Sequence, residues 1–249
     1  MANWDTVYSK KFGGTWYPNE GVVRFTARYL KRRVGILAYD TKRQVKRILD
    51  AGCGNGRHVV FFAQQGFQVY GLDISKGAVN VARAWLNQQK LKAMVQVADI
   101  EKLPFPNEYF DVVICVETLD HMLFSKARKA IREIKRVLRA DGYACISLRS
   151  TESSEFGHGK KIAANTFLLQ EGYEKGHTQH FFDFKEVREL LQEFRVFDIE
   201  LYEQKFPALY TVHKAFFQSS QGMKKYIDLK KSLRLDLKDA RWYIGVEKP

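Results

Sequence analysis

A glycine-rich segment, DAGCGNG at residues 50–56, constrains the fold of this chain more than any other feature. Glycines occupy three alternate positions, directly after an apolar run at residues 45–49 and before a helical pattern at residues 58–65. Glycine adopts backbone conformations that other residues avoid, and it lets a ligand approach the backbone closely. The segment therefore predicts a strand, a tight turn with a ligand site, and a helix that stops at Gly66.

Strand and helix patterns then alternate along the chain. The further expected strands are the apolar runs at residues 67–72, 94–97, 110–116 and 143–148. Helical stripes separate several of these runs, and Ser75 is suited to cap the first such helix. Strands joined by helices require right-handed crossovers, so we expect an α/β, Rossmann-like, doubly wound and mostly parallel sheet with helices on both faces.

The N-terminal region departs from this alternation. The first 20 residues carry aromatic side chains among polar residues, and an amphipathic helical pattern follows at residues 21–33. Because this region is aromatic and basic, we expect residues 1–33 to form a lid, with Tyr17 and Arg24 near a bound cofactor or substrate.

The C-terminal region departs from the alternation as well. A helical pattern at residues 184–193 precedes two strand-like segments, residues 196–202 and 241–246, which can pair antiparallel. The lysine-rich residues 203–239 are too long for a hairpin loop and are expected to form an inserted cap element. The predicted organisation is one domain over residues 1–249, with a core of residues 34–202 and 240–249.

Charge and cysteine usage narrow the function. A formal net charge of +13 attracts anionic partners, such as RNA, anionic metabolites or a membrane surface, unless it reflects only solvated helix faces. The three cysteines stand far apart, which favours reduced thiols over a zinc site. The chain shows neither a signal-peptide profile nor the ~20 apolar residues of a membrane span, so we expect a cytoplasmic protein. The sequence does not determine its oligomeric state.

Asp50 and the glycine spacing distinguish between cofactors. Nicotinamide and flavin cofactors are bound by turns with G-x-G-x-x-G spacing, whereas this turn has G-x-G-x-G. A carboxylate at the end of the strand would repel a pyrophosphate, but it would attract the sulfonium and ammonium groups of S-adenosylmethionine. The pattern therefore favours S-adenosylmethionine as the cofactor.

Acidic residues also follow the second and third expected strands. Asp73 can accept hydrogen bonds from two ribose hydroxyls, or it can act as a simple helix cap, a role for which Ser75 is already available. Ile74 would then pack beside the adenine. Asp99 can accept from the adenine amino group while the backbone N–H of Ile100 donates to a ring nitrogen.

Taken in order, these segments resemble the motifs of class I S-adenosylmethionine-dependent methyltransferases: DAGCGNG, GLDIS, ADIEKLPF, FDVVICVETLDHM and LRADGYACISL. The resemblance spans roughly residues 45–150, and it implies a seven-stranded sheet whose last two strands form an antiparallel hairpin. It also implies that the cofactor pocket is lined by Gly52, Gly54, Asp73, Asp99, Ile100 and, mainly through its backbone, Cys115. Asn55 and Gly56 join these candidates as neighbours in the glycine-rich segment.

The acceptor of the methyl group is expected beyond the fourth and fifth strands. His121 is the first candidate for a general base, with a structural role as the alternative, and Glu117 is the second. His177 and His180 can contact the substrate or merely support the next helix. The spacing of these two histidines lacks a third ligand, so no metal is expected.

Three classes of function remain: a methyltransferase, a nicotinamide oxidoreductase on a related sheet, and a noncatalytic S-adenosylmethionine-binding module. Glycine spacing and Asp50 argue against the oxidoreductase, and fold analogy underlies the choice of an enzyme. A small-molecule acceptor is our first expectation, because no RNA-binding module is recognisable. RNA is the alternative, bound through basic residues such as Lys224, Lys225, Arg128 and Arg132.

Overall fold

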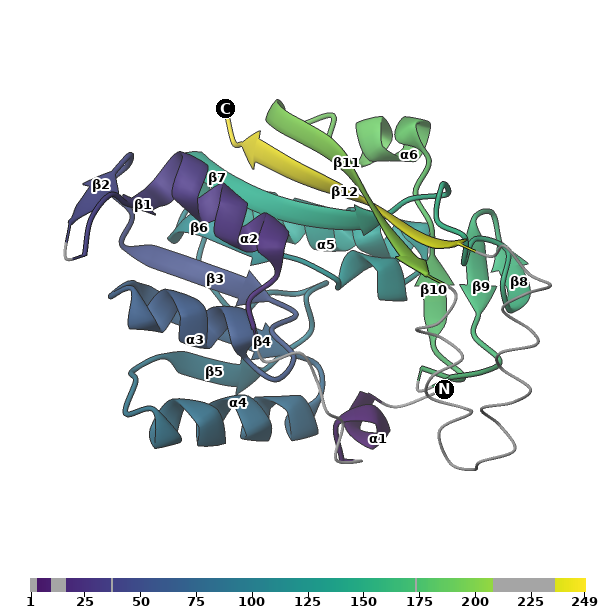
Figure 1. The fold of residues 1–249 in the computed structure, drawn as a ribbon, viewed down its shortest axis with the longest axis horizontal. Coiled ribbons are helices and arrows are strands. Elements are labelled where there is room, and N and C mark those ends of the chain that lie inside the picture. Colours follow the sequence, from purple (N-terminus) through teal and green to yellow (C-terminus); the bar gives the residue numbers. More distant parts are fainter. Residues whose placement is uncertain (1–3, 10–16, 37, 173, 208–235) are drawn as a thin grey trace.

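The computed structural model describes residues 4–9, 17–36, 38–172, 174–207 and 236–249. A seven-stranded sheet crosses it in the order β11-β12-β7-β6-β3-β4-β5 (Figure 1). The strands are β3 (Arg47–Ala51), β4 (Gln68–Asp73), β5 (Met94–Val97), β6 (Phe110–Cys115), β7 (Leu138–Arg149), β11 (Arg195–Pro207) and β12 (Asp236–Glu247). The first five are parallel, and β12 is antiparallel to both β7 and β11. The expected fold class, including the antiparallel hairpin, is confirmed.

Helices cover both faces of the sheet (Figure 1). Alternate residues of each strand face opposite sides, so Ile48 packs in one apolar cluster and Leu49 in the other. The cluster of Ile48 includes residues of α2 (Glu20–Phe25), α3 (Arg57–Gln64) and α4 (Lys76–Gln88). The cluster of Leu49 includes residues of α5 (Phe124–Val137) and α6 (Phe184–Leu190).

Local signals placed most of the sheet correctly. The strand expected at residues 94–97 is β5, and those expected at residues 67–72 and 110–116 agree with β4 and β6 to within one residue. Ser75 caps α4, because its hydroxyl accepts from the backbone N–H of Ala78 at 3.0 Å. Because β3, β4, β5, β6 and β7 are parallel, all five end at one edge of the sheet, where ligands of such folds bind.

The helix expected at residues 21–33 is wrong beyond Leu30. After α2, a π-helical turn (Thr26–Leu30) ends the helix, and β1 (Lys31–Arg33) pairs antiparallel with β2 (Tyr39–Thr41). The carbonyl of Leu30 accepts from the backbone N–H of Lys42 at 2.9 Å, a hairpin bond that a continuous helix could not make. Pairing across the loop thus overrides the helical apolar spacing.

Two further segments differ from expectation. The segment between β7 and α6, for which no strand is expected, contains a small three-stranded sheet of β8 (Lys160–Ala163), β9 (Thr166–Leu168) and β10 (Thr178–His180). The expected inserted element at residues 203–239 begins and ends as strand, because β11 extends to Pro207 and β12 starts at Asp236. The rest of that element, including Lys224 and Lys225, lies outside the described residues.

A buried ion pair connects the loop after β6 to the C-terminal strand. Asp120 lies in a 3-10 turn (Leu119–His121), and its carboxylate accepts from the guanidinium of Arg241 on β12. The other carboxylate oxygen of Asp120 accepts from the backbone N–H of Arg149 on β7 at 2.7 Å. Asp120 and Arg241 are only 1% and 4% exposed, so the pair brings together two opposite charges that are shielded from solvent.

We expect Asp120→Asn to lower the free energy of unfolding by about 3–5 kcal/mol, because it leaves the Arg241 charge buried without its closest counter-ion. Urea denaturation of the variant and the wild type measures this difference. Glu189→Gln is the control, since Glu189 pairs with Arg128 at 3.2 Å on the exposed surface and its loss should cost less than about 1 kcal/mol. Equal effects of the two substitutions would contradict the role of the buried pair.

Candidate functional site

The glycine turn after β3 brings backbone segments into close contact. Gly52 and Gly54 have φ angles of 83° and 51°, in the left-handed region that favours glycine. A Cβ atom at Gly52 would lie 2.3 Å from Oγ1 of Thr118, which follows β6. The turn is held to β4 by Asp73, whose carboxylate accepts from the backbone N–H of Gly54 and of Ser75, both at 2.9 Å.

Asp50 lies at the end of β3, and it is only 1% exposed. Its Oδ1 atom is 3.7 Å from Nδ1 of His58, whereas its buried Oδ2 atom has no hydrogen-bond partner among the described residues. The backbone N–H of Asn19 donates to Nε2 of His58 at 3.2 Å, so a neutral His58 carries its proton on Nδ1, toward Asp50. A buried carboxylate with an unpartnered oxygen fits a cationic ligand.

The other expected cofactor-binding residues line the same edge of the sheet. Burial raises the pKa of Asp73, and each of its oxygens keeps acceptor capacity beyond its single backbone donor. Ile74 is 60% exposed beside it, and Ile100 is buried after β5. Asp99 is exposed and accepts from the backbone N–H of Glu101 at 2.8 Å. Asn55 and Gly56 complete the turn, and Cys115 is buried in β6.

A short N-terminal helix, α1 (Trp4–Ser9), packs over this edge of the sheet (Figure 1). Asp5 accepts from the Ser75 hydroxyl at 2.7 Å and from the backbone N–H of Gly77 at 2.8 Å, at the start of α4. A Cβ atom at Gly54 would lie 2.7 Å from the Tyr8 hydroxyl. Trp4 and Tyr8 are among the aromatic residues of the first 20, and the structure brings both to the site.

Trp4, the first residue of α1, contacts the acceptor side of the site. Its ring centroid lies 4.9 Å from that of His121 and 4.1 Å from that of His177. Nδ1 of His121 and Nε2 of His177 are buried and lack hydrogen-bond partners among the described residues. Burial lowers the pKa of His121, so its imidazole is neutral near pH 7. Helix α1 therefore contacts the glycine turn and two of the expected acceptor residues.

Glu117 occupies a different electrostatic environment. Its side chain pairs with the guanidinium of Arg57 and accepts from the Asn19 amide at 3.2 Å. Burial raises the pKa of Glu117, but Arg241 and Arg57 outweigh burial and lower it to about 2. Glu117 also has a φ angle of 57°, a strained conformation of the kind that occurs at functional sites. The carboxylate is therefore a fixed anion near neutral pH.

The environment of His180 differs from that of His121 and His177. It is fully buried, its Nδ1 atom is 2.7 Å from the Thr166 hydroxyl, and its ring stacks on Phe124 with centroids 5.6 Å apart. Burial lowers its pKa to about 4. This environment is typical of a structural histidine.

Among the described residues, Tyr17 and Arg24 make no hydrogen bond, ion pair or ring contact with the glycine turn. Tyr17 is 81% exposed, and Arg24 pairs with Glu200 at 3.1 Å on β11. Asn19 takes the inward position instead, because its amide also donates to the Tyr243 hydroxyl at 2.9 Å. The sequence does not indicate this role of Asn19, because its partners lie on segments that are distant in the chain.

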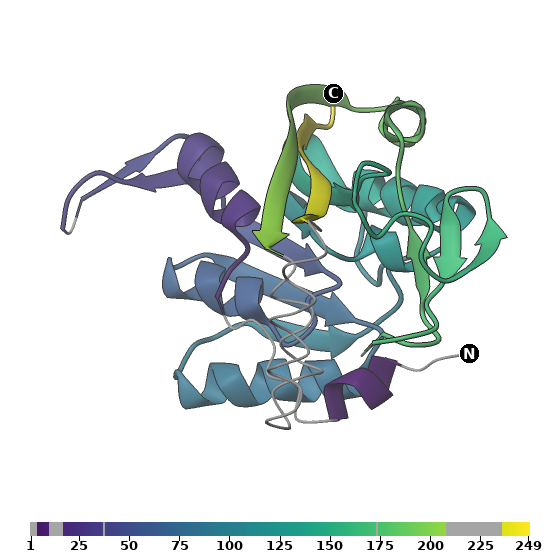
Figure 2. The same cartoon turned by 45° about the vertical axis from the view of Figure 1, so that its right-hand side comes forward.

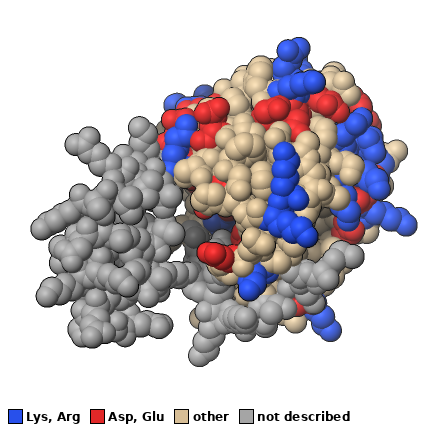
Figure 3. Space-filling view, turned by 90° about the vertical axis from the view of Figure 1, so that its right-hand side faces the viewer, with Lys and Arg blue, Asp and Glu red and all other residues tan. Residues whose placement is uncertain are grey.

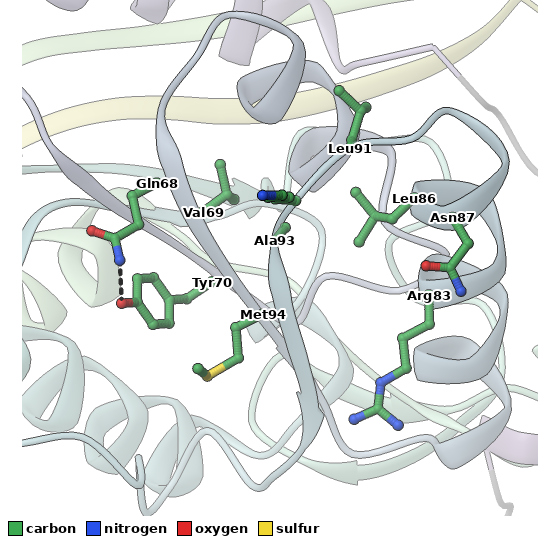
Figure 4. A pocket seen from close by; sticks show the side chains of 10 residues that line it. Gln68, Val69, Tyr70, Arg83, Leu86, Asn87, Leu91, Ala93 and Met94 are labelled. Carbon is green, nitrogen blue, oxygen red and sulfur yellow. Dashed lines mark hydrogen bonds between the residues drawn. The ribbon is translucent and has the colours of Figure 1, made fainter.

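Other candidate sites are weaker. In the described part of the chain, no group of three or more metal-ligating side chains comes together, and no helix is long and apolar enough to cross a membrane. A cavity of about 510 Å³ is lined by residues such as Gln68, Arg83 and Met94 (Figure 4). It opens where β4 and β5 begin, at the opposite edge of the sheet from the glycine turn.

Comparison with known proteins agrees with this geometry. A family model described as a methyltransferase domain matches residues 49–146. The uncharacterized methyltransferase YcgJ of Bacillus subtilis is 36% identical over 101 residues, which cover 40% of this chain and 39% of that protein. The ubiquinone biosynthesis O-methyltransferase of Coxiella burnetii is 38% identical over 77 residues, covering 31% and 33%. The chain thus matches less than half the length of these curated relatives.

The solved structures extend the likeness to most of the chain. A structure of a SAM-dependent methyltransferase from Methanosarcina mazei matches with a TM-score of 0.64 and 21% identity, over 83% of this chain and 93% of that one. At this identity the match shows a shared fold.

The environment of His180 predicts a pH dependence of stability. Its pKa falls from 6.5 to about 4 on folding, so the unfolded chain binds more protons between these values. The free energy of unfolding should therefore fall as the pH is lowered through this window. Chemical denaturation at a series of pH values should give a smaller fall for His180→Gln than for the wild type, with part retained because burial lowers the pKa of His121 too. An unchanged slope would contradict the assignment.

Proposed function

We propose that this chain, which carries a class I S-adenosylmethionine-dependent methyltransferase domain, transfers a methyl group from S-adenosylmethionine to a small-molecule acceptor. The observation that carries the proposal is the pair of carboxylates at the carboxyl ends of β3 and β4. Asp50 offers a cationic group a buried oxygen that has no partner in the described part of the chain, and Asp73 offers acceptor capacity to ribose hydroxyls.

The proposed mechanism depends mainly on positioning. Bound S-adenosylmethionine supplies a methyl group on a cationic sulfur, which is already activated for in-line attack. Helix α1 shields the site from water through Asp5 at α4 and Trp4 at the histidines. His121, neutral near pH 7, is suited to take a proton from the acceptor. Glu117 contributes a fixed negative charge instead.

Two observations support a small-molecule acceptor. The C. burnetii relative is named for ubiquinone biosynthesis, and Trp4 packs against His121 and His177 in a compact aromatic group suited to a planar acceptor. The RNA alternative gains little from α5, because Arg128 and Lys135 pair with Glu189 and Glu193. Lys, Arg, Asp and Glu side chains are also interspersed on the face viewed in Figure 3.

We place the protein in the cytoplasm, in keeping with three free, buried cysteines.

The cofactor assignment is tested by calorimetric titration with S-adenosylmethionine. Asp50→Asn keeps the side-chain volume but removes the charge, so we expect affinity to fall at least about tenfold. Asp111→Asn is the matched control, since Asp111 is also a buried carboxylate but lies at the other end of a neighbouring strand, where it accepts from backbone N–H groups. Equal affinities of the two folded variants would refute the role of Asp50.

The general base is tested after a screen with labelled cofactor, against small molecules and RNA, has identified an acceptor. We expect His121→Ala to lower kcat about 100-fold with little change in cofactor affinity. The wild-type rate should rise with pH and level off at a lower pH than an ordinary histidine would give, because burial lowers the pKa of His121. His180→Gln is the control and should retain both rate and pH profile. A His121→Ala enzyme with the wild-type profile would leave catalysis to positioning.

A further inference from the structure

The β1–β2 hairpin, residues 31–41, projects from the body of the molecule in both ribbon views (Figures 1 and 2). Its end carries large apolar side chains that face solvent: Ile36 is 84% exposed, Val34 53% and Tyr39 48%. Single exposed apolar residues are common on protein surfaces, but three on one projecting hairpin mark an interaction site.

Several backbone groups at the end of the hairpin are paired with one another or with Arg33. The N–H groups of Val34 and Gly35 both donate to the carbonyl of Ala38, at 3.0 and 3.3 Å. The guanidinium of Arg33 donates to the carbonyls of Gly35 and Ile36. Because these polar groups have partners, entry of the apolar side chains into a nonpolar environment leaves them satisfied.

Basic residues flank the apolar end in the sequence. Residues 31–43 contain five basic side chains and a single acidic one, Asp40. Asp40 lies 2.6 Å from Nζ of Lys42 and 3.6 Å from Arg32, and their side chains remain 43% and 56% exposed. The hairpin therefore presents apolar residues at its end and a net positive charge along its strands.

We propose that the β1–β2 hairpin docks this protein onto an anionic lipid surface. Ile36 and Val34 enter the lipid interface, while Arg32, Arg33 and Lys42 lie at the level of the anionic headgroups. A nucleic acid would use the positive charge but leave Ile36 exposed, and a second copy of the chain would meet the same positive charge. Lipid is the partner that satisfies both features.

The position of the hairpin keeps this surface separate from the candidate active site. The hairpin lies near the beginning of β3, whereas the glycine turn and α1 lie at the carboxyl ends of the strands (Figure 1). Lipid docking therefore leaves the cofactor-binding residues free, and the inference stands independently of the proposed reaction.

The test is sedimentation of the full chain with two kinds of vesicle: phosphatidylcholine alone, and phosphatidylcholine in which about a third of the lipid is phosphatidylglycerol. We expect binding to the anionic vesicles, weakened by salt, and at least about tenfold weaker binding to the neutral ones. Ile36→Ser combined with Val34→Ser should reduce anionic-vesicle binding at least about tenfold. The control Ile162→Ser, at a residue 45% exposed on β8, should bind as the wild type does.

A dye at position 36 tests insertion directly. The three native cysteines are buried, so Ile36→Cys can be labelled selectively with an environment-sensitive dye. Its emission should shift to the blue with anionic vesicles, and that of the control Ile162→Cys should not. Calorimetry with S-adenosylmethionine should give the same affinity for the hairpin variants and the wild type. Wild-type protein that stays with the supernatant would overturn the proposal, as would hairpin substitutions that alter only self-association or RNA binding.

Discussion

Asp120 joins parts of the chain that are far apart in sequence. Its carboxylate accepts from the Arg241 guanidinium and from the backbone N–H of Arg149, so the turn after β6 is fixed to β7 and β12. That turn also carries His121, whose ring meets Trp4 of α1. The position of the candidate base and the contact that holds α1 against it both depend on one buried charge pair. Such a pair is costly to desolvate, but it is far more costly to break.

Charges close to one another are used differently around the glycine turn. Glu117 has cationic partners in Arg57 and Arg241, which lower its pKa to about 2. Among the described residues, Asp50 has only the long contact with His58, and one of its oxygens has no hydrogen-bond partner. The negative charge of Glu117 is thus compensated within the protein, whereas Asp50 retains the capacity to bind a cation. Asn19 links the two environments, because its amide contacts Glu117 and its backbone N–H contacts His58.

The two edges of the sheet have opposite surface chemistry. At the carboxyl edge, α1 packs against the glycine turn and adds acidic and aromatic side chains to it. At the other edge, the β1–β2 hairpin exposes apolar and basic side chains. Because the strands are parallel, these two sets of residues are held apart by the length of the sheet (Figure 2). The same fold can therefore bind a cofactor and contact a separate surface.

The amino-acid sequence by itself determined the parallel core, the glycine turn, the strand-end aspartates and the Ser75 cap, because each depends on residues close together in the chain. Tertiary structure alone decided which charges and rings meet. In the sequence Glu117 is a candidate base, but in the structure Arg57 and Arg241 lower its pKa. His180 is a candidate substrate ligand in the sequence, but in the structure its ring stacks on Phe124. The helix predicted at residues 21–33 likewise ends at Leu30, and a hairpin follows. Residues 39–42 supply hydrogen-bond partners to the backbone of this segment across a loop. Local spacing specifies the elements, whereas contacts between distant segments set the pKa, burial and orientation of each functional side chain.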